Sequence, residues 1–246
     1  MKLEPEILKY LKGENLSTGL TVELSKTKYE IIPREAKIVE IIRNKDVIHV
    51  GCSDHIQVIN DKIKNNIWLH KLITDNARRC IGIDIDRNSI EYIRKELHYT
   101  NVYSGDVLKD PFDIISEKHW DYVVFGEIIE HLDNPVDFLK IFRNRFGNSI
   151  SRFVITVPGI YNLFHYRKML DYTETTNSDH RFAFTPYTIN KVIVSAGYLP
   201  ESIFYANLIK LTIPELVFRK IKYILHIPVK YPFYYFKSII VTGKFY

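Results

Sequence analysis

The stretch Asp46-Val47-Ile48-His49-Val50-Gly51-Cys52-Ser53-Asp54 decides the fold that we predict for this chain. It reads as a short apolar strand over residues 46–50 that stops at Gly51 and continues into a polar loop. A glycine has no Cβ, so a ligand can approach its backbone closely, and open α/β sheets bind ligands at the carboxyl edge of their strands. We therefore expect a pocket beside Gly51. A tight turn needed only for folding explains this one glycine equally well.

Strand-like and helix-like segments alternate along the rest of the chain. Apolar runs predict further strands at 80–85, 101–103, 120–125, 152–157, 202–207 and 238–243. Helical spacing and capping residues predict helices at 4–12, 33–42, 66–79, 88–97, 112–118, 134–144 and 185–196. Residues 56–66 are ambiguous, and residues 160–184 form a long segment without periodicity that we expect to be functional. The alternation predicts an α/β fold with a mostly parallel sheet and helices on both faces.

The composition is that of an ordinary globular domain. The 246 residues are 46% apolar and 26% charged, with a net charge of +5. The two cysteines, Cys52 and Cys80, allow neither a disulfide framework nor a zinc pattern, so we expect a reducing, cytoplasmic location. We expect one domain, divided into an N-terminal helical cap (1–44), a core (45–207), a basic aromatic insertion (208–236) and a last strand (237–246).

Two acids follow the second and third predicted strands. Asp84 can accept hydrogen bonds from both hydroxyls of a ribose, or it can cap the next helix. Asp86 is the better cap, which leaves Asp84 free for a ligand. Asp106 can accept from the exocyclic amine of an adenine, or it can serve as a turn acid after Gly105. Gly51 and Asp84 are farther apart than in the simple dinucleotide fingerprint, which predicts an added turn or helix around residues 62–68.

A third group of polar residues follows the fourth predicted strand. Glu127 and Glu130 lie one helical turn apart, so they can share a face. Glu127 is a candidate to bind a ligand ammonium group, and His131 is a candidate general base near neutral pH. The alternative is that Glu130 and His131 are surface or packing residues of a short turn.

Taken together, these motifs resemble those of class I S-adenosylmethionine-dependent methyltransferases, in particular a bacterial subgroup found in surface-glycan and natural-product clusters. The resemblance covers roughly residues 35–205. It departs from the family in the glycine loop, where Ser53 and His55 replace the later glycines. It is carried by residues 47–52, 82–85, 104–106, 121–132, 153–158, 179–186 and 196–198.

The resemblance implies a Rossmann-like, doubly wound, seven-stranded and mostly parallel sheet with an antiparallel last strand, and S-adenosylmethionine as cofactor. It implies that Gly51, Cys52 and Ser53 contact the amino-acid end of the cofactor, with Glu127 near its methionine moiety. It also implies that Asp84 binds the ribose, that Ile85 lies against the adenine, and that Asp106 and Val107 hold the adenine edge.

Methyl transfer from a sulfonium is an in-line displacement, so the protein mainly aligns the reactants and removes a proton from a hydroxyl acceptor. His131 is the first candidate for the base, and His180 and His165 are the alternatives. Tyr161 and Tyr166 either line the acceptor site or pack the long loop. His165, Asp179 and His180 could in principle bind a divalent metal, but their spacing matches no ligand signature, so we predict no metal.

The segment 208–236 is basic and aromatic-rich, with an amphipathic helical pattern. From Lys210 to the end there are seven basic residues and one acid, a net charge of +6, so the rest of the chain is near neutral. An insertion that packs on the domain or forms a homodimer contact is the favoured explanation. A peripheral membrane contact is the sharper alternative. Outside this segment the sequence reveals no basic face that would indicate a nucleic-acid partner.

The leading hypothesis is therefore an enzyme that transfers a methyl group to a hydroxyl of a small molecule, with a sugar or surface-glycan precursor as acceptor in polysaccharide biosynthesis. The alternatives are a quinone-like or lipid-like acceptor, a nitrogen, a protein or an RNA. A cofactor-binding module without catalysis is the alternative from another class. A nicotinamide-dependent enzyme is disfavoured because the later glycines of its loop are absent.

Overall fold

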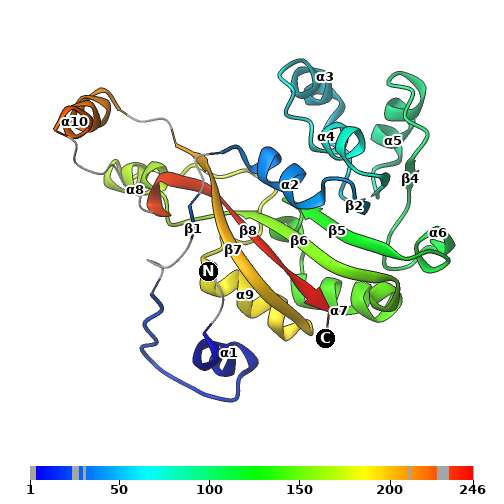
Figure 1. The fold of residues 1–246 in the computed structure, drawn as a ribbon, viewed down its shortest axis with the longest axis horizontal. Helices are drawn as coiled ribbons and strands as arrows, with labels where there is room; N and C mark the ends of the chain where they lie inside the picture. Colours follow the sequence, from blue (N-terminus) through cyan, green and yellow to red (C-terminus); the bar gives the residue numbers. More distant parts are fainter. Residues whose placement is uncertain (1–3, 24–27, 30–31, 210–211, 226–232, 246) are drawn as a thin grey trace.

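The computed structural model describes residues 4–23, 28–29, 32–209, 212–225 and 233–245 of the chain. Its centre is one twisted sheet (Figure 1). The strands are β1 (Lys28–Tyr29), β2 (Asp46–Val50), β3 (Arg79–Asp84), β4 (Val102–Ser104), β5 (Trp120–Gly126), β6 (Ile150–Pro158), β7 (Tyr198–Leu208) and β8 (Phe236–Phe245).

The order of the strands is β1-β7-β8-β6-β5-β2-β3-β4. Strand β8 runs antiparallel to its neighbours β6 and β7, and the other pairs are parallel. The seven-stranded Rossmann-like sheet with an antiparallel last strand is thereby confirmed, and the two-residue strand β1 extends its edge. The chain runs from β2 outward to β4 and then returns to place β5 on the other side of β2. That reversal is the switch point beside which such sheets bind ligands.

Helices cover both faces of the sheet, as predicted. Helices α6, α7 and α9 contribute to the larger buried cluster on one face, whereas α2 and α4 pack on the other. Helices α3 and α5 pack together at the β3–β4 end. The helices are α1 (Pro5–Lys12), α2 (Arg34–Ile42), α3 (Ile56–Lys64), α4 (Leu69–Asn76), α5 (Arg87–Lys95), α6 (Asp113–Ser116), α7 (Pro135–Phe146), α8 (Leu163–Leu170), α9 (Pro186–Ser195) and α10 (Ile213–Ile224).

The N-terminal helices do not form the single cap expected for residues 1–44. Helix α1 lies against α9, where the Lys191 ammonium donates to the carbonyls of Tyr10 and Leu11 at 2.8 and 2.7 Å. Helix α2 packs on the opposite face with α4. The sequence pattern could not separate the two sites because both helices simply present an apolar stripe.

Three segments are more regular than the sequence pattern suggested. The ambiguous residues 56–66 contain helix α3, so the long β2–β3 connection holds two helices. The long segment 160–184 contains α8, which Asn162 caps by accepting from the backbone N–H of His165 at 3.2 Å. None of the α8 side chains is buried, which explains why no periodic stripe marks this helix. Strands β7 and β8 are longer than predicted because they pair along most of their length.

Helix α10 confirms the amphipathic pattern in 208–236, and its described apolar side chains are largely exposed. Ile213, Leu216 and Ile224 are 77%, 51% and 63% exposed. In Figure 1 the helix stands near α8 at the end of the sheet opposite α5. No helix in the described part of the chain has the length and apolar character of a membrane span.

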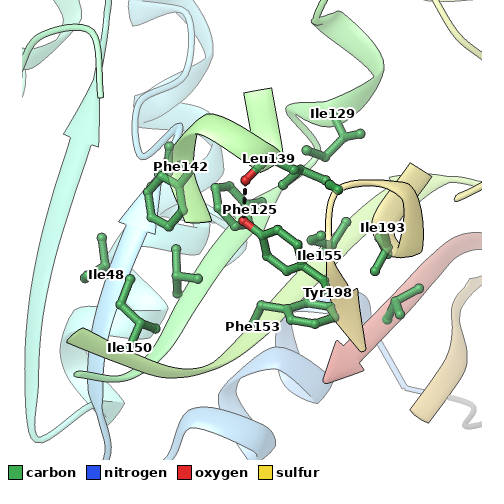
Figure 2. Packing of buried hydrophobic residues seen from close by; sticks show 14 of the residues in the cluster. Ile48, Phe125, Ile129, Leu139, Phe142, Ile150, Phe153, Ile155, Ile193 and Tyr198 are labelled. Atoms are coloured by element: carbon green, nitrogen blue, oxygen red, sulfur yellow. Dashed lines mark hydrogen bonds between the residues drawn. The ribbon is translucent and has the colours of Figure 1, made fainter. Parts of the chain in front are cut away.

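Aromatic side chains fill the core between the sheet and helices α7 and α9 (Figure 2). The rings of Phe125 and Phe142 meet edge to face at 5.0 Å, and those of Phe153 and Tyr198 meet at 5.2 Å. The buried Tyr198 hydroxyl donates to the Leu139 carbonyl at 2.9 Å, which ties the start of β7 to α7. This packing holds α7 against the sheet.

We predict that Tyr198→Phe lowers the free energy of unfolding by about 1 kcal/mol, because a buried hydrogen bond is lost while the ring is kept. Urea unfolding followed by circular dichroism measures the change. Tyr172→Phe is the matched control, since Tyr172 is 99% exposed. Equal stability of the two variants would show that the Tyr198 bond contributes nothing.

Candidate functional site

A cavity of about 780 Å³ lies at the carboxyl ends of β2, β3, β4 and β5. This volume is within the range of small-molecule sites. The cavity brings together every residue that the sequence assigned to the cofactor and two of the candidate bases, His131 and His180. These residues are Gly51, Cys52, Ser53, Asp84, Ile85, Asp106, Val107, Glu127, His131 and His180.

Gly51 is required by the fold itself and not only by a ligand. Its φ is +74°, in the left-handed region that favours glycine. A Cβ built on Gly51 would lie 2.2 Å from Cγ2 of Ile128, so an added side chain would collide with the protein. Close approach of a ligand is therefore not the main reason why residue 51 is a glycine, although Gly51 lines the cavity as predicted.

Asp84 ends β3 and organises the loop that follows β2. Its two carboxylate oxygens accept from the backbone N–H groups of Ser53, at 2.9 Å, and Asp86, at 3.0 Å. Asp86 is the helix cap, because its side chain accepts from the N–H groups of Asn88 and Ser89 at the start of α5. Asp86 is thus the cap, as predicted, and Asp84 lines the cavity. The next residue, Ile85, is 73% exposed beside the cavity.

Asp106 lies in the turn after β4 and has local partners. One of its oxygens accepts from the Leu108 N–H at 2.9 Å, and the other pairs with the Lys109 ammonium at 3.0 Å. Desolvation opposes ionisation, but these partners outweigh it and lower the pKa of Asp106. Asp106 is therefore both a turn acid and a cavity residue, so the two sequence interpretations are compatible.

Glu127 follows β5 with φ +58°, and its N–H donates to the Thr156 carbonyl at 3.0 Å. Its carboxylate forms an ion pair with Arg34, the first residue of α2. Arg34 is only 8% exposed and also pairs with Glu35 at 2.7 Å. Burial alone would lower the pKa of Arg34, but Glu127 and Glu35 together raise it. Sequence reasoning missed Arg34, because nothing in the α2 pattern shows that its first turn reaches the cavity.

Glu130, His131 and His180 form a compact group at one end of the cavity. Potential ligand atoms of all three lie within 4.8 Å of one another. The His131 and His180 rings meet edge to face with centroids 4.6 Å apart. Burial raises the pKa of Glu130 to about 8, and burial together with His131 lowers the pKa of His180.

The backbone and Arg181 hold this group together. The Glu130 carbonyl accepts from the N–H groups of Arg181 and Phe182 at 2.8 and 3.3 Å. The Arg181 side chain pairs with Asp133 and donates to the His131 carbonyl. The long segment after β6 is thus pinned to the turn after β5, although 50 residues of sequence separate Arg181 from His131.

His165 does not belong to this group. It lines a second cavity of about 1,470 Å³, formed by the segment after β6 together with Glu215, Tyr234 and Tyr235. Asp179 lines the first cavity. Among the described residues, the set that could hold a metal ion is Glu130, His131 and His180, and not the His165, Asp179 and His180 set considered from the sequence.

The second cavity adjoins the first. Pro158, Asn177 and His180 line both. Tyr161, Tyr166 and Phe182 line the second cavity. His180 therefore stands at the junction of the two spaces.

His49 and His70 form a buried pair under the first cavity. His49 comes from β2 and His70 from α4, with their Nδ1 atoms 3.4 Å apart and their rings stacked at 5.5 Å. Burial lowers the pKa of His70 to about 4. Burial, together with the neighbouring His70 and Arg34, lowers the pKa of His49 well below its ordinary value. Both imidazoles are therefore neutral at pH 7. Sequence reasoning missed this pair because His49 was read only as part of a strand.

Comparison with known proteins is consistent with this architecture. No protein-family model matches the chain, and no curated protein matches its sequence. An S-adenosylmethionine-dependent methyltransferase from Archaeoglobus fulgidus has a TM-score of 0.51 at 17% identity, over 86% of this chain and 91% of that one. The small RNA methyltransferase HEN1 has a TM-score of 0.55 at 17% identity, over 86% of this chain and 25% of that one. A bacterial Hen1 methyltransferase domain has a TM-score of 0.50 at 15% identity, with coverage of 86% and 97%.

The chain thus has the Rossmann-like fold of class I S-adenosylmethionine-dependent methyltransferases. At this level of identity the likeness concerns the fold. The function of the chain depends on the residues of its own cavities.

The buried histidine pair predicts an acid-sensitive fold. The folded-state pKa of His70 lies below the unfolded value near 6.5, so the unfolded chain binds more protons between these values. Stability is therefore lost as the pH falls through 6.5, by about 2 kcal/mol for one such histidine between pH 7 and pH 5. Urea unfolding at both pH values should show a smaller loss for His70→Leu than for the unaltered protein.

The control is His119→Asn, since His119 is exposed. Its loss of stability between pH 7 and pH 5 should equal that of the unaltered protein. If His70→Leu also shows the full loss, burial of His70 does not cause the acid sensitivity.

Proposed function

We propose that this protein is an S-adenosylmethionine-dependent methyltransferase that methylates a hydroxyl of a small molecule. The observation that carries the proposal is the pair of adjoining cavities. The first has one acid at the end of each of β3, β4 and β5, and the second meets it at His180. A donor in the first cavity and an acceptor in the second would face each other at this junction, which is the alignment that in-line displacement needs.

The nucleoside of the donor fits the β3–β4 side of the first cavity. Each Asp84 oxygen is held by one backbone N–H group, which fixes the carboxylate and leaves further lone pairs for two ribose hydroxyls. Ile85 exposes its apolar side chain there, and Val107 lines the same space, so an adenine ring would cover both. Asp106 is placed to accept from the adenine amine.

The amino-acid end of the donor fits the β2–β5 side. Gly51, Cys52 and Ser53 bring the backbone to this side of the cavity. Glu127 lines this side of the cavity, and its carboxylate, which Arg34 holds in place, can also bind the ammonium group of the donor. The donor thereby meets one fixed carboxylate at each of its three polar parts.

The reaction itself requires little covalent chemistry from the protein. The acceptor oxygen attacks the methyl carbon, the carbon–sulfur bond breaks with its electron pair going to sulfur, and the hydroxyl proton leaves to a base. His131 and His180 lie at the cavity junction and are the assigned bases of this proposal. His165, farther into the second cavity, is the remaining candidate.

The lining of the second cavity supports a sugar or glycan precursor as acceptor. Tyr161, Tyr166 and Phe182 offer aromatic faces on which the CH groups of a sugar stack, and the exposed Glu174 and Thr175 offer polar groups for its hydroxyls. The near-neutral charge of residues 1–209 argues against RNA, although one protein of similar fold is an RNA methyltransferase by name. A donor-binding module without catalysis would not need the second cavity.

Donor binding gives the first test. Asp84→Asn removes the charge that holds two ribose hydroxyls, and we expect it to weaken binding of S-adenosylhomocysteine by about 100-fold in calorimetry. Asp106→Ala, on a different strand end, should weaken binding about tenfold. Asp61→Asn, an exposed acid on α3, is the control and should bind as the unaltered protein does.

If calorimetry detects no heat of binding for either the methyl donor or its demethylated product, the whole assignment is wrong. If the donor binds, but no methyl transfer to nucleotide sugars or sugar lipids follows, the enzyme reading fails while the binding site stands.

Helix α10 supports an acceptor that is presented at a membrane surface, and we propose an anionic lipid surface as its partner. Its exposed Leu216, Val217 and Ile221 form one unpartnered apolar face within the described chain, and Lys220 is exposed beside them. Glu215 of the same helix lines the second cavity and pairs with Arg167 of α8 at 2.6 Å. A membrane contact here would bring lipid-linked substrate to the mouth of the acceptor cavity.

Vesicle pelleting tests this contact. The protein should sediment with phosphatidylglycerol vesicles and not with phosphatidylcholine, and 0.5 M salt should release it. Leu216→Ser combined with Ile221→Ser should reduce binding at least tenfold, because two apolar side chains no longer enter the interface. Val58→Ser, an exposed apolar residue on α3, should change nothing.

Absence of pelleting at low salt would overturn the membrane contact. If sedimentation velocity instead shows a dimer that the double variant abolishes, the occupant of this face is a second copy of the chain.

A further inference from the structure

We propose that Glu130, His131 and His180 form a binding site for one divalent transition-metal ion of the Mn²⁺ or Zn²⁺ type. The three side chains come from the short 3₁₀ turn Ile129–His131 after β5 and from the segment that Arg181 ties to that turn. The existence of the site does not depend on the proposed function, but its role in catalysis rests on it.

Glu130 is the first observation. Its side chain is completely buried, and neither carboxylate oxygen has a hydrogen-bond partner in any other residue that the structure describes. A carboxylate buried in this way is costly unless a cation or hydrogen bonds compensate it. Arg34 is nearby, but its guanidinium is paired with Glu127 and Glu35. Glu130 lines the cavity, so a cation that enters there can reach it.

The two histidines are the second and independent observation. The ring of His131 lies edge to face against that of His180, and Nε2 of His180 is 3.9 Å from Oε1 of Glu130. Metal–ligand distances of about 2.1 Å place neighbouring ligand atoms roughly 3.0–3.5 Å apart. The present spread of 4.8 Å needs only small side-chain rotations to reach that range.

The donor set indicates the kind of ion. Two imidazoles and one carboxylate suit Mn²⁺, Zn²⁺ and similar borderline ions, whereas Mg²⁺ and Ca²⁺ prefer oxygen ligands alone. Three protein ligands leave further coordination positions open, which is the pattern of catalytic and not of structural metal sites. The open side faces the cavity that these residues line.

The place of the site defines its role. His180 lines both cavities, so an ion bound to it would lie where the acceptor hydroxyl meets the methyl donor. Coordination lowers the pKa of a hydroxyl group and holds its oxygen in a fixed direction. The proton then leaves to solvent, since a histidine nitrogen that binds metal has no lone pair left for a proton. In the metal-bound protein His131 and His180 would therefore be ligands, which replaces the role of bases that the proposed function gives them without a metal.

The test uses the full-length protein after treatment with EDTA and dialysis. Titration with MnCl₂, followed by calorimetry and by the loss of the free Mn²⁺ signal in electron paramagnetic resonance, should show one ion per chain. ZnCl₂ should displace it. Glu130→Gln, His131→Asn and His180→Asn should each weaken Mn²⁺ binding at least tenfold, whereas the exposed His119→Asn should not alter it.

Binding of S-adenosylhomocysteine by the same variants reports whether they remain folded. If no Mn²⁺ or Zn²⁺ binds, or if His119→Asn and the three site variants bind alike, the metal site is refuted. If the ion binds but EDTA-treated protein keeps full methyl transfer, the catalytic role is refuted and the histidines act as bases. If the ion binds and the methyl donor does not, the metal site stands and the proposed function fails.

Discussion

The pairing of β2 with β3 on one side and with β5 on the other is the constraint on which the rest of the structure depends. Parallel register places Val50 beside Ile83 and beside Phe125, so three strands end at the same level. A turn follows each of these strands, and polar side chains of these turns line the same cavity. The backbone N–H of Ser53 donating to Asp84 joins two of these turns directly. Without this reversal of strand order there would be no cavity at this edge.

The acidic side chains around the cavity are of two kinds. Asp84, Asp106 and Glu127 each have partners within the protein, from backbone N–H groups, Lys109 and Arg34 respectively, so their carboxylates are held in fixed orientations. Glu130 is more deeply buried than any of them and lacks such partners in the described structure. A preorganised carboxylate binds a neutral or cationic group at little cost. A buried carboxylate without such partners instead indicates that another bound group completes the site.

Much of the fold and of the donor side of the cavity could be predicted from the sequence. Apolar runs that stop at a glycine or at an acid mark the strand ends at Val50, Asp84 and Gly126. The structure ends β2, β3 and β5 at these residues. Arg34 and the His49–His70 pair could not be predicted, since their roles arise from contacts between α2, β2 and α4. Helix α8 was missed for a related reason: it buries no side chain, so it leaves no apolar period in the sequence.

By itself, the sequence determined the alternation of strands and helices and the polar residues at the strand ends, because both follow from local spacing and backbone preference. Only the tertiary structure decided which helices cover which face, why Gly51 is needed, and which histidine meets which carboxylate. His180 is 50 residues from Glu130 and reaches it only because Arg181 and Phe182 donate to the Glu130 carbonyl. Contacts between distant segments depend on how complementary surfaces pack, and no short pattern of residues encodes that.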